Sequence, residues 1–236
     1  MNTVIYITLG IFDALAMLLV ILKLYMLPVR EYAGKIVAFV VFIASLSYMM
    51  RITLDIPKLD LPLQYIFFIL FLRFGMELKI HLTSFIAGAG ISAYAALQMG
   101  IFYIYKWLDI MHVGIVQQNE GLLVYLLQIS SILVAYVICF IFHLFDYGFS
   151  FIVKPPHDFL TREDYLSRKN VPIIIGAVIS AITICLTLVF LYNSDPLWLL
   201  LMALLTFSIS YYFSYRRERG DVRAAIEAYR NKNKGS

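Results

Sequence analysis

One carboxylate in this sequence lies deep inside a long apolar run, where it could do chemistry. Asp13 is the deepest ionisable side chain of the chain, within the stretch GIFDALAMLLVIL. An ionised carboxylate in hydrocarbon costs on the order of a few kcal/mol, so we expect Asp13 to face other helices or a wet cavity, or to be protonated. A ligand or proton site would explain it, and so would a hydrogen bond that packs two helices near the outer interface.

The stretch HLTSFIAGAGISAYAALQMG carries two sets of residues spaced by four. Gly90, Tyr94 and Gln98 place a phenol and an amide on one face of a helix. A second set, offset by two residues or about 200°, contains only small side chains, which let helix backbones approach closely. These helix-packing candidates are Ser84, Gly88, Ser92, Ala96 and Gly100. We therefore expect this helix to be buried on both sides.

Aromatic side chains follow on the same helix and in the connection after it. Tyr103 and Trp107 lie near the start of the segment 105–121, the one substantial outer connection in a seven-span topology. An interfacial aromatic belt explains these rings by themselves, and a ligand-lining role is the alternative. The complete set of ligand-binding candidates is Asp13, Tyr94, Gln98, Tyr103 and Trp107.

Metal and enzyme chemistry find little support in the sequence. The histidines are scattered at His81, His112, His143 and His157, and only His143 has a nearby partner, Asp146, three residues on. A structural metal site needs about four ligands, and no third falls at a matching spacing. Hydrolase, zinc-protease and phosphate-loop motifs are missing, and the last two apolar runs hold no lysine for a retinal Schiff base. We expect no metal, no cofactor and no enzymatic activity.

Composition points to a membrane protein. Of the 236 residues, 62% are hydrophobic and 14% are charged, and the mean hydropathy is +0.84. Soluble domains carry about 25% charged residues, so we expect an all-α polytopic bundle without a soluble domain. Most of the excess positive charge lies in the last twenty residues, beside a membrane segment. Anionic lipid and topology explain this charge better than nucleic acid does.

Windows of about 20 apolar residues predict seven spans. They are Val4–Leu24, Lys35–Met50, Leu61–Phe74, His81–Tyr105, Leu122–Phe145, Val171–Tyr192 and Leu197–Tyr215. The third is weak, because only twelve uncharged residues separate Asp60 from Arg73. Six spans are therefore the alternative.

Basic residues indicate the orientation. Seven spans with the N-terminus outside place sixteen Lys and Arg inside and three outside, and six spans with the N-terminus inside give fifteen against four. Both topologies put the connection 146–170 and the C-terminus in the cytoplasm. We expect 154–170 to be a loop with a short helix.

Two regions follow from these patterns, a bundle over 1–215 and a basic juxtamembrane tail over 216–236. In the tail, Val222, Ile226 and Tyr229 share one stripe, and Gly220 is expected to interrupt the helix after the last span.

A family resemblance accompanies these patterns. The Gly-x-x-x-Tyr-x-x-x-Gln helix after LFLRFGMELKI resembles the membrane sensor region of Agr-type peptide-pheromone receptor histidine kinases, whose kinase part belongs to the GHKL group. The run IFDALAMLLVILKLYMLPVREY is similar to the opening of kinase-associated membrane regions. In that family a helix with a phospho-accepting histidine follows the last span. The present sequence has no histidine after His157, so the resemblance implies an excised sensor region or a kinase-less relative.

The resemblance implies a bacterial quorum-sensing receptor in the cell membrane. Such a protein would bind an amphipathic peptide or lipid-like ligand from outside and signal through its last helix and tail. A kinase or another membrane protein, or a second copy of the chain, would be its partner. A transport-complex or scaffold subunit is the alternative, because compact loops and small-residue helices suit both classes.

Overall fold

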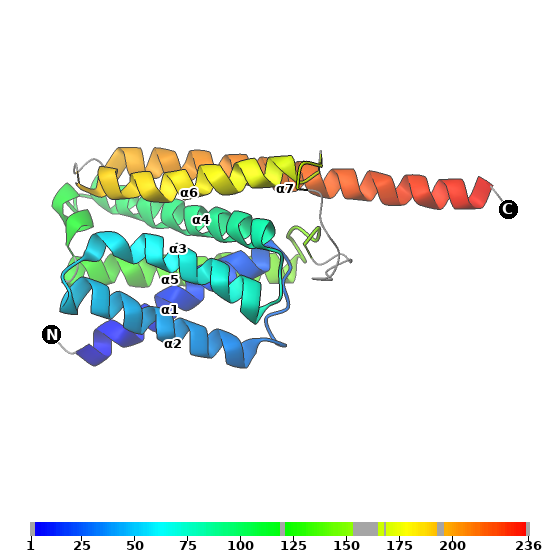
Figure 1. Ribbon diagram of the computed structural model, residues 1–236. Helices are drawn as coiled ribbons and strands as arrows, with labels where there is room; N and C mark the ends of the chain where they lie inside the picture. Colours follow the sequence, from blue (N-terminus) through cyan, green and yellow to red (C-terminus); the bar gives the residue numbers. More distant parts are fainter. Residues whose placement is uncertain (1–2, 119–120, 153–164, 168, 193–195, 235–236) are drawn as a thin grey trace.

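The chain is a bundle of long helices with one helix end projecting from it. The computed structural model describes residues 3–118, 121–152, 165–167, 169–192 and 196–234, and these contain helices and turns without any strand (Figure 1). The α-helices are α1 (Thr3–Leu24), α2 (Ala33–Tyr48), α3 (Asp60–Leu70), α4 (Ile80–Trp107), α5 (Leu122–Leu144), α6 (Val171–Tyr192) and α7 (Pro196–Lys234). Short helical turns extend or connect them: η1 (Met49–Thr53), η2 (Pro57–Leu59), η3 (Phe71–Gly75) and η4 (Val113–Gln117).

Helix α4 lies at the centre of the bundle. It packs against α6 and α7 on one side and against α1, α3 and α5 on the other, while α2 lies outermost against α1 (Figure 1). Of the membrane-length helices, α4 buries by far the largest share of its residues. The expectation that this helix is buried on both sides is therefore confirmed.

The connections turn sharply at the two ends of the bundle. Among the described residues, five other than glycine adopt positive φ there, and three of these are aspartates, which tolerate this left-handed backbone better than most side chains. They are Met26, Asp55, Glu77, Asp109 and Asp146.

The structure contains five helices long and apolar enough to cross a membrane, in agreement with the predicted membrane class. They are α1, α2 continued through η1, α4, α5 and α7. Helix α3 has 11 residues and continues directly into the 5 residues of η3, and together they rise at most about 24 Å, still short of a bilayer's hydrocarbon core of about 30 Å. Helix α6 is a shorter apolar helix over Val171–Thr187, the part whose side chains are described. The number of long apolar helices is thus smaller than the seven spans predicted from sequence.

Helix α7 does not break at Gly220, contrary to the sequence-based expectation. It continues for 39 residues from Pro196 to Lys234, and its last part extends away from the bundle (Figure 1). A glycine costs a helix only about 1 kcal/mol relative to alanine, which the charged helix-forming residues around it offset. The short helix expected within 154–170 cannot be compared with the structure, because 153–164 and 168 lie outside the described residues.

Candidate functional site

The central helix meets α1 through two residues of its Gly-Tyr-Gln face. A Cβ added to Gly90 would lie 2.1 Å from Ile21 Cγ1, so the backbones of α4 and α1 approach closely at this point. One turn further along, the Tyr94 hydroxyl donates a hydrogen bond to Asp13 Oδ1. The glycine thus allows the approach that brings the phenol to the carboxylate.

A third helix, α5, completes the surroundings of Asp13. The Gln128 side chain lies beside the carboxylate. The Tyr136 hydroxyl donates a 3.1 Å hydrogen bond to the backbone carbonyl of Phe12, the residue before Asp13. Residues from α1, α4 and α5 therefore form one polar group inside apolar helices.

A second carboxylate is buried nearby, at the start of α3. Asp60 is fully enclosed, and its Oδ2 accepts hydrogen bonds from Ser47 Oγ, at 2.8 Å, and from Arg51 Nε. Its Oδ1 accepts a bond of 2.9 Å from Gln64 Nε2, one turn along the same helix. The side chain of Arg51 is 39% exposed, so this ion pair has one solvated and one desolvated partner.

The two carboxylates belong to one electrostatic neighbourhood. Arg51 is bonded to Asp60 and lies within electrostatic range of Asp13. We call the set Asp13, Arg51, Asp60, Tyr94 and Gln128 the polar cluster. Its carboxylates, guanidinium, phenol and amide gather hydrogen-bonding groups among otherwise apolar helices.

Three of the predicted ligand-binding residues lie apart from this cluster. Gln98 is half-buried and makes no side-chain hydrogen bond within the described part of the chain. Tyr103 packs edge-on against Phe102, with the Lys106 ammonium 5.5 Å from its ring centre. Trp107 is 84% exposed, as expected for an interfacial aromatic ring. Of the five predicted ligand-binding residues, the structure therefore brings Asp13 and Tyr94 together in the polar cluster. Gln98, Tyr103 and Trp107 are not part of this cluster.

The small-residue set of α4 packs tightly over part of its length. Ser84 Oγ lies 2.8 Å from the Tyr65 hydroxyl of α3. A Cβ on Gly88 would meet Ser180 Cβ of α6 at 2.3 Å. Ser92 and Ala96 are also buried, whereas nothing lies within 4 Å of a Cβ placed on Gly100. The close approach therefore ends before the last member of the set.

Sequence reasoning missed Arg51, Asp60, Gln64 and Gln128. It used Asp60 only to mark the start of a weak span and counted Arg51 only as an outer charge. The spacing of Asp60 and Gln64 by four residues was an available signal, because such pairs share a helix face. The pairing of Asp60 with Ser47 and Arg51 could not be read from spacing, since a turn separates the two helices.

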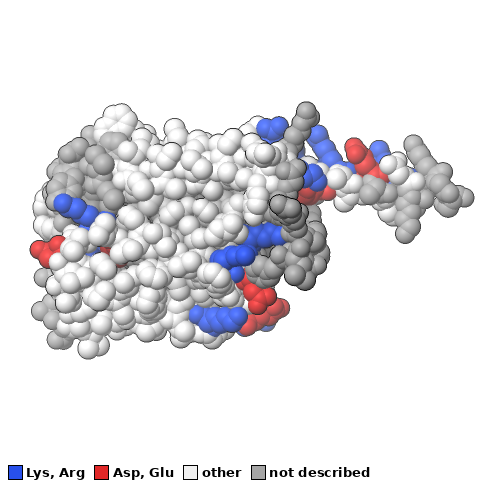
Figure 2. All heavy atoms as spheres, in the orientation of Figure 1, with Lys and Arg blue, Asp and Glu red and all other residues white. Residues whose placement is uncertain are grey.

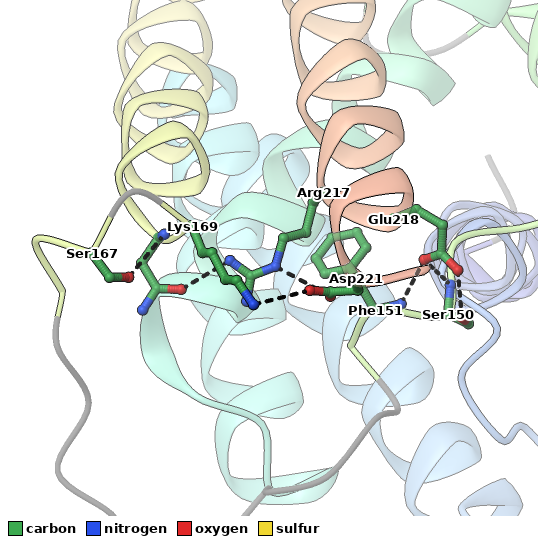
Figure 3. A network of polar contacts seen from close by, with 8 residues as sticks. Ser150, Phe151, Ser167, Lys169, Arg217, Glu218 and Asp221 are labelled. Carbon is green, nitrogen blue, oxygen red and sulfur yellow. Dashed lines mark hydrogen bonds and ion pairs between the residues drawn. The ribbon is translucent and has the colours of Figure 1, made fainter. Parts of the chain in front are cut away.

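A different network holds α7 where it leaves the bundle (Figure 3). The Glu218 carboxylate accepts hydrogen bonds from the backbone N–H groups of Ser150 and Phe151, both at 2.9 Å, and from Ser150 Oγ at 2.6 Å. Asp221 forms ion pairs with Arg217 at 3.4 Å and with Lys169 at 3.6 Å. The network ties the connection after α5 and the start of α6 to α7.

One further contact joins these segments. Tyr147, just after α5, shares a hydrogen bond with Tyr211 of α7. This bond, with some burial, raises the pKa of Tyr147 to about 12. Both phenols of this contact are protonated at physiological pH, so each hydroxyl can serve as donor or acceptor.

The described residues contain no group of three His, Cys, Asp or Glu side chains arranged to hold a metal ion. The fold and its buried polar groups define a helical membrane protein. No family model, curated protein or solved structure matches the chain.

Proposed function

We propose that this protein is an integral membrane sensor that binds an amphipathic peptide or lipid-like ligand and signals through its last helix and tail. In this proposal the polar cluster receives the polar part of the ligand. All seven α-helices cross the cell membrane, with α3 crossing in a locally thinned region, and the C-terminus lies in the cytoplasm.

The observation that carries the proposal is the position of α4 between the polar cluster and α7. One face of α4 holds Tyr94 against Asp13. The helix also packs along α7, which continues without a break out of the bundle (Figure 1). A ligand that separates Tyr94 from Asp13 would shift α4, and α7 would carry that shift to the tail. Such coupling requires two states with different affinity for the ligand.

The charge distribution supports the proposed orientation. Lys and Arg gather at the end of the bundle where α7 leaves it, and the middle of the visible face is free of charged residues (Figure 2). This end contains Lys23, Lys35, Arg73 and the basic residues of α7. Basic residues favour the cytoplasmic side, so the polar cluster would lie toward the outside.

The resemblance to Agr-type sensor regions supports peptide ligands and, as partners, a kinase or a second copy of this chain. In those receptors the last span leads into the kinase part. The projecting part of α7 would occupy the corresponding place here. The proposal for quorum sensing rests on this resemblance.

A fluorescent tail tests the proposal. The full chain is placed in lipid nanodiscs with Cys139 and Cys185 replaced by alanine, and a dye is attached at Ala225→Cys, on the exposed part of α7. A panel of cyclic and linear amphipathic peptides is then titrated. We expect saturable changes in dye emission that Tyr94→Phe abolishes.

Tyr105→Phe is the matched control. This variant also removes a phenol hydroxyl from α4. The Tyr105 hydroxyl shares a hydrogen bond of 2.6 Å with Ser130 Oγ of α5, and neither residue belongs to the polar cluster. The control should keep the response. Equal behaviour of the two variants, or a dye that responds to no peptide while the protein remains folded, would count against the sensor.

A scaffold or transport-complex subunit is the second candidate. The observation that favours it is the exposed stripe on the projecting part of α7, where Val222 is 44%, Ile226 50% and Tyr229 68% exposed. A partner protein could cover this stripe without any ligand-dependent change. In that case Tyr94→Phe would lower stability slightly and leave the dye signal unaltered.

A further inference from the structure

A pocket lies between the start of α6 and α7, at the end of the bundle with the polar network of Figure 3. Its volume is about 100 Å³. One wall is apolar and is formed by Pro172, Ile173 and Phe213. The other part is charged and contains Lys169, Arg216, Arg217 and Asp221. The pocket thus joins an apolar half to a half with more positive than negative charge.

Some charged side chains of the pocket have partners within the described part of the protein, and one does not. Asp221 is engaged by Arg217 and Lys169, and Arg217 also donates a 3.3 Å hydrogen bond to Asn170 Oδ1. Arg216 is exposed and makes no ion pair or hydrogen bond with any residue that the structure describes. Its guanidinium is therefore available to an anion from outside the protein, and guanidinium groups bind phosphate through two parallel hydrogen bonds.

The position of the pocket indicates where this anion comes from. On the side toward the middle of the bundle, α6 and α7 expose apolar residues: Ile175 is 47%, Val178 52% and Leu204 44% exposed. Tyr212 and Tyr215, in the turn of α7 before Arg216, are 56% and 42% exposed, as is typical of rings at the headgroup level. The pocket lies where a surface for acyl chains gives way to basic residues.

We propose that this pocket binds the phosphate of an anionic phospholipid. Arg216 and Lys169 contact the phosphate, Arg217 is held in place by Asp221, and Phe213 with Ile173 packs against the glycerol and upper acyl region. Basic pockets between membrane helices are suited to anionic headgroups. A bound lipid would bridge the start of α6 and the base of α7, beside the Glu218 contacts. The proposal depends on the membrane location and not on the sensor function.

Titration of the purified full chain in neutral detergent tests it. Short-chain phosphatidylglycerol, short-chain phosphatidylcholine and inorganic phosphate are each added, and lipid retention by native mass spectrometry and the melting temperature are measured. We expect phosphatidylglycerol to bind saturably and to raise the melting temperature, with phosphatidylcholine clearly weaker. Arg216→Gln should weaken phosphatidylglycerol binding about fivefold, and Lys169→Gln with Arg216→Gln about thirtyfold, because each basic group near an anionic headgroup contributes roughly a factor of five.

The controls distinguish a specific binding site from nonspecific electrostatic attraction of the anionic lipid. Arg216→Lys retains the charge and should lose less affinity than Arg216→Gln. Arg223→Gln removes the same exposed group two turns further along α7, outside the pocket, and should leave binding unchanged. Since Arg216 has no partner in the described chain, its loss should not alter the lipid-free melting temperature. Equal losses for Arg216→Gln and Arg223→Gln, equal binding of the two lipids, or an equal effect of inorganic phosphate would each overturn the lipid site.

Discussion

The interior of the bundle around α4 and the projecting part of α7 place similar chemical groups in opposite surroundings. In the interior, Asp60 is fully enclosed and accepts three hydrogen bonds, and Gly88 lies against Ser180 without room for a Cβ. At the base of the projection, Glu218 accepts hydrogen bonds from Ser150 and Phe151, and the neighbouring Arg219 is exposed to solvent.

This difference shows how burial changes the value of a contact. Water can replace a lost partner at the projecting end, so each polar contact there contributes little net free energy. No water is available to a group enclosed among apolar helices, so a missing partner leaves the full desolvation penalty. Similar hydrogen bonds should therefore stabilise the two regions by different amounts.

The largest effect should come from Gly88→Leu. Its side chain would have to displace Ser180 and separate α4 from α6, which should lower the free energy of unfolding by more than about 3 kcal/mol. The measurement is reversible unfolding in mixed detergent. Gly100→Leu is the control, because nothing lies within 4 Å of its Cβ position. If both variants unfolded at the same detergent ratio, the interior would not be tightly packed at Gly88.

Asp60→Asn should have the next largest effect. The amide removes the charge that pairs with Arg51 and turns an N–H group toward one of the three donors, so we expect a loss of about 2–3 kcal/mol. Asp55→Asn makes the same chemical change at an exposed turn residue and should alter stability by less than about 0.5 kcal/mol. The same unfolding measurement compares the two. A small effect at Asp60 would mean that water reaches this carboxylate.

Glu218→Gln should have a smaller effect on stability. The amide keeps one acceptor for the two N–H groups of Ser150 and Phe151, and solvent can replace the rest, so we expect a loss of roughly 0.5–1 kcal/mol. Hydrogen exchange of the residues just after α5 should nevertheless become faster, because their tie to α7 is weakened. A loss as large as that of Asp60→Asn would remove the distinction between the two regions.

The smallest effect should follow from changing the exposed stripe of the projecting part of α7. Ile226→Ser changes a half-exposed side chain with no core contact, so the free energy of unfolding of the isolated chain should change by less than about 0.5 kcal/mol. Its oligomeric state or partner binding would change only if the stripe is covered in the cell. Size-exclusion chromatography with light scattering on the wild-type chain and on Ile226→Ser measures the oligomeric state. A large loss of stability would show that the stripe already packs within one chain.

The sequence by itself determined the class of the protein and the character of its central helix. Apolar runs and low charge specify a helical membrane protein because the backbone of a spanning segment must satisfy its own hydrogen bonds. The fourfold spacings around Gly88 and Tyr94 specify two buried faces because helical geometry is local. Gln98 and Gly100 continue these spacings but not the contacts, since helix spacing alone does not tell where a neighbouring helix diverges.

Only the tertiary structure decided which polar groups meet. Asp13 and Tyr94 are 81 residues apart, and the Asp60 cluster joins residues from two helices across a turn. Such pairings depend on how helices rotate and tilt against one another, which no single segment encodes. The continuity of α7 through Gly220 is different in kind, because it depends on helix-forming neighbours in the same segment, whose combined propensity outweighs that of one glycine.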